Sequence, residues 1–158
     1  MPTRKLLEFL DGERIKYVTI THSPAFTMSE IAAVAHISGK KVAKTVMVEV
    51  DGKMAMAVVP SSYKVELGLL KDVTGAKKVR ISTEKEFKEL FPGCEPGAMP
   101  PFGNLYGMEV YVSPELAEAD EIAFNAGSHT ELVRLAFADF ERLVQPKIPA
   151  TSFGVIGS

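Results

Sequence analysis

The sequence predicts an α+β domain in which helices wrap a mixed, strongly curved, barrel-like β-sheet. The length of 158 residues fits one domain with a single substantial core. Two strand-like runs, 42–50 and 53–60, are apolar on nearly both faces, so helices or a closed sheet must cover each side. Helix-like and strand-like segments also mix without the regular βαβ alternation of a doubly wound parallel sheet.

Composition and charge exclude several classes of protein. Hydrophobic residues make up 46% and charged residues 24%, which is typical of a soluble globular protein. The apolar runs are too short to cross a bilayer, and Glu8, Asp11 and Glu13 interrupt any signal-peptide core, so we expect a cytoplasmic protein without a membrane partner. A formal net charge of −2 argues against a general nucleic-acid coat, and we expect no DNA partner.

Two clusters of basic residues are compatible with a local contact to a phosphate backbone. The first contains Lys40, Lys41 and Lys44, and the second covers residues 77–80. An ordinary solvated surface is the alternative for either cluster, and on the sequence alone it is the favoured interpretation.

Local signals in the first third of the chain predict a helix, a strand, a helix and a hairpin. Apolar residues at helical spacing predict a helix over 3–11, and a β-branched run predicts a strand over 17–21. Thr27-Met28-Ser29-Glu30 has the form of a capping box and predicts a helix that ends near Gly39. Asp51-Gly52 predicts a tight hairpin turn, because these residues tolerate positive φ.

The middle of the chain carries further start and stop signals. Ser61-Ser62 is expected to cap a helix that ends around Gly75, and residues 77–81 read as a strand. Thr83-Glu84-Lys85-Glu86 is a second capping box, and Pro92-Gly93 ends the helix that it opens.

The last third of the chain predicts three strands and a helix. Strands are expected over 105–112, 121–125 and 130–135, with a short helical turn that has Pro114 at its first position. Apolar residues at helical spacing predict a helix over 138–144.

We expect the domain to span residues 1–146. The remaining residues, 147–158, contain Pro149, Gly154 and Gly157 and are predicted to form a loose C-terminal tail.

The segment Gly97-Ala98-Met99-Pro100-Pro101-Phe102-Gly103 is the most distinctive loop. Adjacent prolines exclude both a helix and a central strand, because each removes a backbone donor and fixes φ. Backbone groups that no ladder uses must find partners elsewhere. The loop is therefore either a stiff wall of a small-molecule pocket or a structural turn.

Lys44 is the most unusual residue of the predicted hairpin. It shares its alternation phase with Val46, Val48 and Val50, although strand interiors disfavour lysine. If Lys44 faces inward, its ammonium needs a phosphate or developing negative charge on a substrate oxygen. Alternatively, its stem packs at the mouth of the strand and its charged end reaches water.

The other residues with reactive groups form no recognisable catalytic set. Gly127-Ser128-His129 offers amides, a hydroxyl and an imidazole, but no aspartate completes a triad. Cys94 has no signature of a nucleophile and is interpreted as a packed thiol. The histidines lack metal-ligand spacing, so we expect neither a metal nor a cofactor.

Three motifs occur here in the order found in a known family. Ala43-Lys44-Thr45, the Gly97–Pro101 segment and Phe124-Asn125-Ala126-Gly127-Ser128 resemble motifs of the YbaK-like aminoacyl-tRNA deacylases, which are similar to the editing domain inserted in bacterial prolyl-tRNA synthetases. The resemblance runs from about His22 to Val144. It implies the YbaK/prolyl-tRNA synthetase-associated domain fold, and it favours the inward orientation of Lys44.

The resemblance also implies a chemistry. The expected reaction hydrolyses the ester that joins a wrong, small amino acid to the terminal adenosine of a tRNA, without a metal or a covalent intermediate. Lys44 corresponds to the family's essential residue, and the ribose hydroxyl or the substrate's own side chain assists. The residues expected to contact substrate are Thr45, Gly97, Met99, Pro100, Pro101, Gly127, Ser128 and His129.

Several alternatives stay open at this point. The amino acid is not determined, although tRNA-Pro is the expected tRNA, and His129 is either a pocket wall that limits side-chain size or a catalytic group. The expected partners are a mischarged tRNA and, as a further candidate, a synthetase. A non-catalytic module of the same fold that binds a nucleotide or an oligonucleotide is the alternative function, and a metal-dependent hydrolase is disfavoured.

Overall fold

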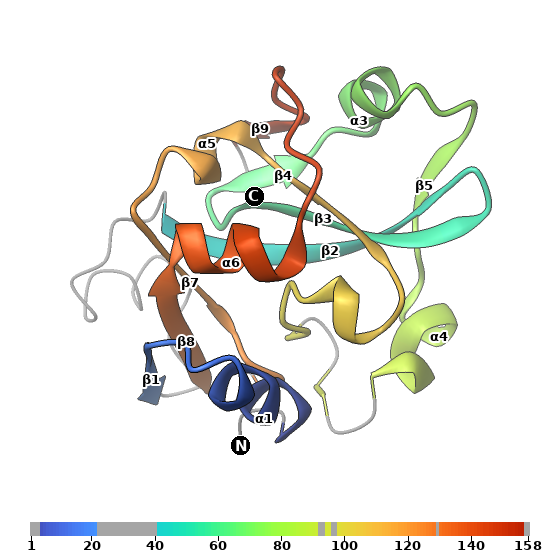
Figure 1. Ribbon diagram of the computed structural model, residues 1–158. Coiled ribbons are helices and arrows are strands. Elements are labelled where there is room, and N and C mark those ends of the chain that lie inside the picture. Colours follow the sequence, from blue (N-terminus) through green and yellow to red (C-terminus); the bar gives the residue numbers. More distant parts are fainter. Residues whose placement is uncertain (1–3, 22–40, 92–93, 96–97, 129, 157–158) are drawn as a thin grey trace.

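The molecule is organised around one mixed β-sheet (Figure 1). A computed structural model describes residues 4–21, 41–91, 94–95, 98–128 and 130–156. The main sheet contains β1 (Tyr17–Thr21), β2 (Val42–Val50), β3 (Lys53–Pro60), β5 (Val79–Ile81), β6 (Glu109–Val112), β7 (Glu121–Asn125) and β8 (Glu131–Ala136). A second sheet pairs β4 (Tyr63–Val65) with β9 (Gly154–Ile156). The helices are α1 (Arg4–Gly12), α3 (Leu67–Thr74), α4 (Glu84–Phe87), α5 (Pro114–Ala117) and α6 (Phe137–Val144), with 3-10 turns η2 (Lys88–Leu90) and η3 (Gly103–Leu105).

The strand order confirms the predicted mixed α+β class. The order is β1-β8-β7-β2-β3-β6, with β5 pairing with β2 beside this path. The hairpin β2–β3 is antiparallel, whereas β2–β7 and β3–β6 are parallel. The described strands form an open path from β1 to β6, so they do not show the closed barrel that the sequence suggested.

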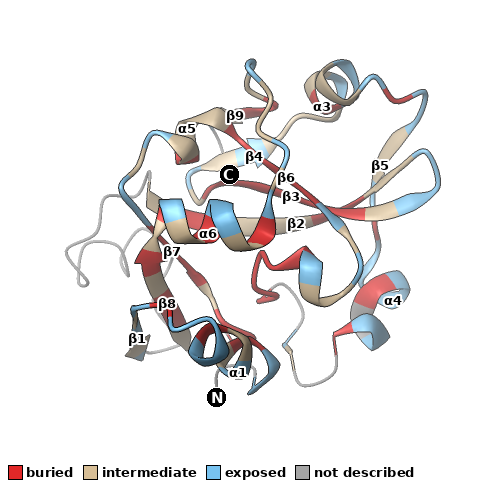
Figure 2. Cartoon of the chain, viewed as in Figure 1, coloured by how far each residue is buried: buried red, intermediate tan, exposed pale blue. Residues whose placement is uncertain are grey.

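The two faces of the sheet carry separate cores. Figure 2 shows buried residues along the central strand β3. Met47 of β2 belongs to the larger core, which also takes side chains from α1, α4 and α6. The next residue, Val48, belongs to the smaller core, which takes Leu70 from α3. This alternation follows from the two-residue period of a strand and explains why both faces of the hairpin are apolar.

Phe102 connects the proline loop to the larger core. It is fully buried, and its ring centroid lies 6.2 Å from Phe9, 5.4 Å from Phe124 and 5.4 Å from Phe140. Helices α1 and α6 and strand β7 therefore all pack against the base of this loop, which fixes its position.

The helix expected from Ser61-Ser62 begins later than predicted. Residues Tyr63–Val65 form β4, and α3 is capped by Glu66, whose carboxylate accepts hydrogen bonds from the backbone N–H groups of Gly68 (3.1 Å) and Leu69 (2.8 Å). Gly75 ends the helix with φ 69°, as predicted. The predicted start of the helix was wrong because β4 pairs with β9. This partner strand is remote in sequence, and no local signal reveals the pairing.

The segment expected to be a loose tail is packed against the domain. Lys147 exchanges backbone hydrogen bonds with β6, donating to Val110 (2.8 Å) and accepting from Val112 (2.9 Å). Further on, Phe153 is fully buried in the smaller core and β9 follows. A sequence rich in proline and glycine nevertheless orders here because one aromatic side chain fills the space beneath α3.

Two other predicted elements differ or cannot be compared. The strand expected over 105–112 begins only at Glu109, after the 3-10 turn η3. The helix expected over 27–39 lies outside the described residues. No helix in the described part of the chain is long and apolar enough to span a membrane.

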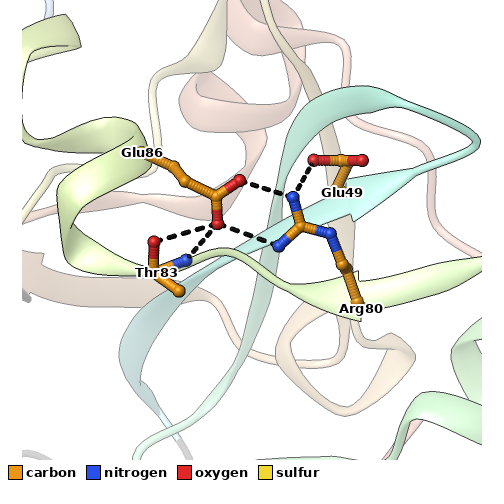
Figure 3. Close-up of polar contacts among 4 residues, drawn as sticks. All are labelled: Glu49, Arg80, Thr83 and Glu86. Carbon is orange, nitrogen blue, oxygen red and sulfur yellow. Dashed lines mark hydrogen bonds and ion pairs between the residues drawn. The ribbon is translucent and has the colours of Figure 1, made fainter.

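An ion-pair network holds β5 and α4 against β2 (Figure 3). Arg80 binds the carboxylates of both Glu49 and Glu86. Glu86 also accepts hydrogen bonds from the Thr83 backbone N–H (2.8 Å) and hydroxyl (3.0 Å), in the predicted capping box. The Arg80 guanidinium, together with Thr83, lowers the pKa of Glu86 to about 2.

Candidate active site

The sheet forks beside Lys44. Strand β7 pairs with β2 only at Val42 and Ala43, and β5 pairs with β2 only from Val48 onward. Between these points, no described strand borders that edge of β2. Within the fork, the Met47 carbonyl accepts the Ser82 N–H at 2.9 Å. Backbone groups of the fork that no strand pairs with can bind a ligand.

Lys44 lies at the start of this fork. Ala43 faces the larger core, so Lys44 faces the other side of the sheet, beside its cross-strand partner Val59. The residue is half-buried, and burial lowers the pKa of its ammonium below the usual value. Its ammonium makes no hydrogen bond or ion pair with any described residue. A partly desolvated cation without a counter-ion is ready to bind an anionic or polarised oxygen.

The two predicted loops are joined edge to edge. Gly127 N–H donates to the carbonyl of Ala98 (2.8 Å), and Gly127 C=O accepts from the N–H of Glu95 (2.7 Å). Gly127 has φ 101°, a conformation that glycine adopts without strain. At Gly127 the two loops are therefore in direct contact.

Ser128 is used within its own turn. Its side chain is buried, its hydroxyl lies 2.9 Å from the hydroxyl of Thr130, and it accepts the Thr130 backbone N–H at 3.1 Å. The hydroxyl therefore orders the turn between β7 and β8, and its capacity to contact a substrate is reduced.

The remaining described contact residues do not lie on the face of the sheet that carries Lys44. Thr45 alternates with Lys44 and faces the opposite side of the sheet, where its cross-strand partner Val58 belongs to the larger core. Met99 packs in that same core, and Pro100 and Pro101 are buried. Gly97 and His129 lie outside the described residues.

Other reactive groups near the loop do not build a catalytic set. Tyr106 interacts with Cys94, and burial raises the pKa of the Tyr106 hydroxyl to about 12. Within the described residues, no group of three histidine, cysteine or acidic side chains could hold a metal ion.

A cavity of about 480 Å³ lies at the far end of the hairpin and contains none of the predicted site residues. Its lining residues are Val50, Lys53, Met54, Ala55, Leu90, Tyr106, Gly107, Met108, Glu109 and Tyr111. Residue 50 is six residues along β2 from Lys44, or about 20 Å. This cavity is therefore separate from the fork.

We expect the Gly103→Ala variant to be less stable by about 1–3 kcal/mol. A Cβ at this position would lie 2.6 Å from the Met108 carbonyl oxygen and 2.6 Å from Val110 Cγ2, so the end of the proline loop would have to shift. Urea denaturation measures the change. Gly12→Ala is the matched control, because no atom lies within 4 Å of its added Cβ. Equal stability of the two variants would show that the close approach at Gly103 is absent in solution.

Comparison with known proteins assigns the chain to a family. The family model of the aminoacyl-tRNA editing domain matches residues 22–143, which include Lys44 and both loops. The multifunctional Ser/Thr-tRNA deacylase ProXp-y of Escherichia coli K12 is 29% identical over 153 residues, covering 92% of this chain and 89% of that protein. A proline–tRNA ligase of Bacillus mycoides is 29% identical over 90 residues, covering 57% of this chain and 16% of the ligase.

Solved structures share the fold. A protein described as a candidate trans-editing enzyme for prolyl tRNA synthetase superposes with a TM-score of 0.79 at 18% identity, covering 94% of this chain and 95% of that one. A hypothetical protein superposes with a TM-score of 0.81 at 18% identity, covering 96% of this chain and 100% of the other. The span of the family match, together with these relatives, shows that the chain belongs to the aminoacyl-tRNA editing domain family.

Proposed function

We propose that this protein is a trans-editing aminoacyl-tRNA deacylase that removes a small, wrongly attached amino acid from a tRNA, with tRNA-Pro as the favoured tRNA. The reaction is hydrolysis: water adds to the ester carbonyl, and the free amino acid and the 3′-terminal ribose hydroxyl of the tRNA are released. One observation carries the proposal, namely Lys44, half-buried and without a side-chain partner among the described residues, at the fork of a sheet whose sequence matches the editing-domain family.

Lys44 is the proposed catalytic residue. Its ammonium stabilises negative charge that develops on the ester oxygen or binds the terminal phosphate, and either contact is stronger in a partly desolvated site than in water. A group that accepts a proton from the attacking water is supplied by the ribose hydroxyl or by the substrate itself. The chain therefore needs no triad for this reaction.

The loops are proposed to hold the aminoacyl group. Their mutual hydrogen bonds through Gly127 give a rigid edge beside the fork. Contacts from Thr45, Met99, Pro100, Pro101 and Ser128 stay predictions, because these side chains face the core or their own turn. Gly97 and His129 are retained as proposed contacts on the family resemblance alone.

Serine and threonine are the first amino acids to test, because the relative ProXp-y is named for their removal. The physical motive for a second site is that one methylene discriminates between substrates by only about 1–3 kcal/mol. A synthetase that confuses small amino acids therefore needs a separate hydrolytic step.

The deciding experiment counts turnovers. Protein at catalytic concentration is incubated with tRNA-Pro charged with serine, threonine, alanine or cysteine, with correctly charged prolyl-tRNA as the control, and released amino acid is measured per protein molecule. Many turnovers on at least one mischarged tRNA support the proposal. Binding of tRNA without turnover on any ester would instead favour the non-catalytic module.

We expect tRNA binding to weaken with salt at a slope of log K against log[salt] of roughly −2 to −3, because a small acidic protein neutralises only about three phosphates. Lys41 and the exposed Lys77 are candidate contacts, and the backbone N–H of Lys77 is fixed by Asp51 Oδ1 at 2.9 Å. Fluorescence titrations of labelled tRNA measure the slope. Lys77→Gln should reduce the magnitude of the slope by about 0.7–0.9, the contribution of one phosphate contact. An unchanged slope would show that Lys77 does not contact the tRNA.

A further inference from the structure

Asn125, to which the sequence motifs gave no role of its own, carries an unused acceptor beside Lys44. It is the last residue of β7, and its side-chain oxygen Oδ1 is closed to solvent without any hydrogen-bond partner among the described residues. A buried polar atom left without a partner costs about 1–3 kcal/mol, so its presence at a sheet fork calls for a functional explanation.

The strand register places Asn125 and Lys44 on the same face of the sheet, directly after the last pair of β2 and β7. Ala43 of β2 pairs with Phe124 of β7 in parallel, and both side chains lie in the larger core. The next residues, Lys44 and Asn125, therefore both point to the other face, one residue beyond the last registered pair of the two strands. Within the described part of the chain, neither Asn125 Oδ1 nor the Lys44 ammonium has a hydrogen-bond partner.

The neighbouring side-chain acceptors are already engaged, whereas the buried Nε of Arg134 has no hydrogen-bond partner in the described part of the chain. The hydroxyls of Ser128 and Thr130 contact each other at 2.9 Å. Glu121, at the opposite end of β7, forms an ion pair with Arg134 at 3.7 Å. Asn125 Oδ1 is thus the acceptor on this face that lies next to Lys44 and is still unused.

We propose that Asn125 binds the α-ammonium group of the aminoacyl ester through its side-chain carbonyl oxygen. A ligand that satisfies both groups must present an oxygen to Lys44 and a donor, best a cation, to Asn125. An α-amino ester has this pattern, because its carbonyl and phosphate oxygens accept hydrogen bonds and its ammonium donates them. The inference rests on the proposed function and adds the residue that distinguishes an amino acid from other acyl groups.

The amide can reach the ligand by a small motion. Asn125 is only half-buried, and the terminal torsion χ2 of asparagine is soft, so rotation brings Oδ1 toward the open side of the fork. An aspartate here would pair with the Lys44 ammonium and compete with the substrate for it. An amide accepts a hydrogen bond without neutralising Lys44, which gives a reason for asparagine at this position.

The test compares two esters on one protein. The preferred aminoacyl-tRNA and the α-hydroxyacyl-tRNA made from it by deamination differ only in the ammonium group. We expect wild-type kcat/KM to favour the amino ester by about 10–100-fold, the effect of one charge-assisted hydrogen bond. Asn125→Leu should lower this ratio, because it slows hydrolysis of the amino ester more than that of the hydroxy ester, whose α-hydroxyl donates only a neutral hydrogen bond. Both kcat/KM values of a variant are measured on the same protein preparation. A smaller fraction of folded protein therefore lowers both values equally and leaves their ratio unchanged.

Controls separate this inference from the proposed function. Asn104→Leu makes the same chemical change at an exposed residue and should keep the wild-type ratio. Non-hydrolysable amide-linked analogues of both substrates, titrated by calorimetry, give the same comparison from binding alone. An unchanged ratio in Asn125→Leu, or an equal loss for both esters, overturns the assignment. If wild-type protein hydrolyses no ester, yet the amide-linked analogues show the expected dependence on Asn125, the proposed function fails and the recognition site stands.

Discussion

Replacing Lys44 with methionine is expected to lower kcat/KM for the mischarged tRNA by about 10²–10³-fold, the effect of removing one donor that stabilises developing negative charge. Methionine retains the length of the apolar stem and removes only the cation, so the packing beside Val59 is preserved. Single-turnover hydrolysis of the preferred ester measures the loss. Lys44→Arg keeps the charge but changes the donor geometry, and it should recover only part of the activity.

The same substitution should leave the fold intact and slightly raise its stability. Burial lowers the pKa of Lys44 in the folded state, so the unfolded chain binds more protons between the two pKa values, and stability contributed by this group rises with pH. At neutral pH the charge therefore opposes folding, and its removal shifts the thermal midpoint upward. The effect is small, because the side chain is only half-buried.

Lys64→Met provides the control for Lys44→Met. Lys64 is an exposed lysine on β4 and should tolerate the change without loss of activity. Near wild-type activity in Lys44→Met would remove Lys44 from the mechanism. Loss of activity together with a lower thermal midpoint would assign it a structural role.

Local signals in the sequence identified the elements that depend on local chemistry. Asp51 and Gly52 have φ 48° and 83°, as the predicted hairpin turn requires. The second capping box forms around Thr83, and Pro114 occupies the start of α5. In each case a few neighbouring residues decide the backbone conformation, so the prediction needed no tertiary information.

The parts that the sequence did not reveal depend on pairing between remote segments. Helix α3 begins later than predicted because the residues before it form β4, which pairs with β9. The fork at Lys44 results from the different points at which β7 and β5 join β2. Motif residues adjacent in sequence, Lys44 and Thr45, fall on opposite faces because a strand alternates. The motif could therefore be identified from the sequence, but which of its side chains share a surface could not be predicted.

The packed C-terminal segment leads to the prediction with the largest effect on stability. Phe153→Ala is expected to lower the free energy of unfolding by about 3–5 kcal/mol, the usual loss for a large aromatic residue removed from a core. The ring is fully buried in the smaller core with Val48, Val59 and Leu70. The Phe153 carbonyl also accepts the Glu66 N–H at 2.9 Å, which joins this segment to the start of α3.

Ile156→Ala is the matched comparison, because this side chain is 78% exposed near the end of the same segment. A surface substitution of this kind changes stability by only about 0.5 kcal/mol. Urea denaturation of both variants, followed by circular dichroism, measures the difference. If Phe153→Ala unfolds at the same urea concentration as Ile156→Ala, the C-terminal segment is loose in solution, as its proline and glycine content predicted. A loss of several kcal/mol confined to Phe153→Ala would show that the segment completes the core on the α3 side of the sheet, the same face from which Lys44 and Asn125 meet the proposed substrate.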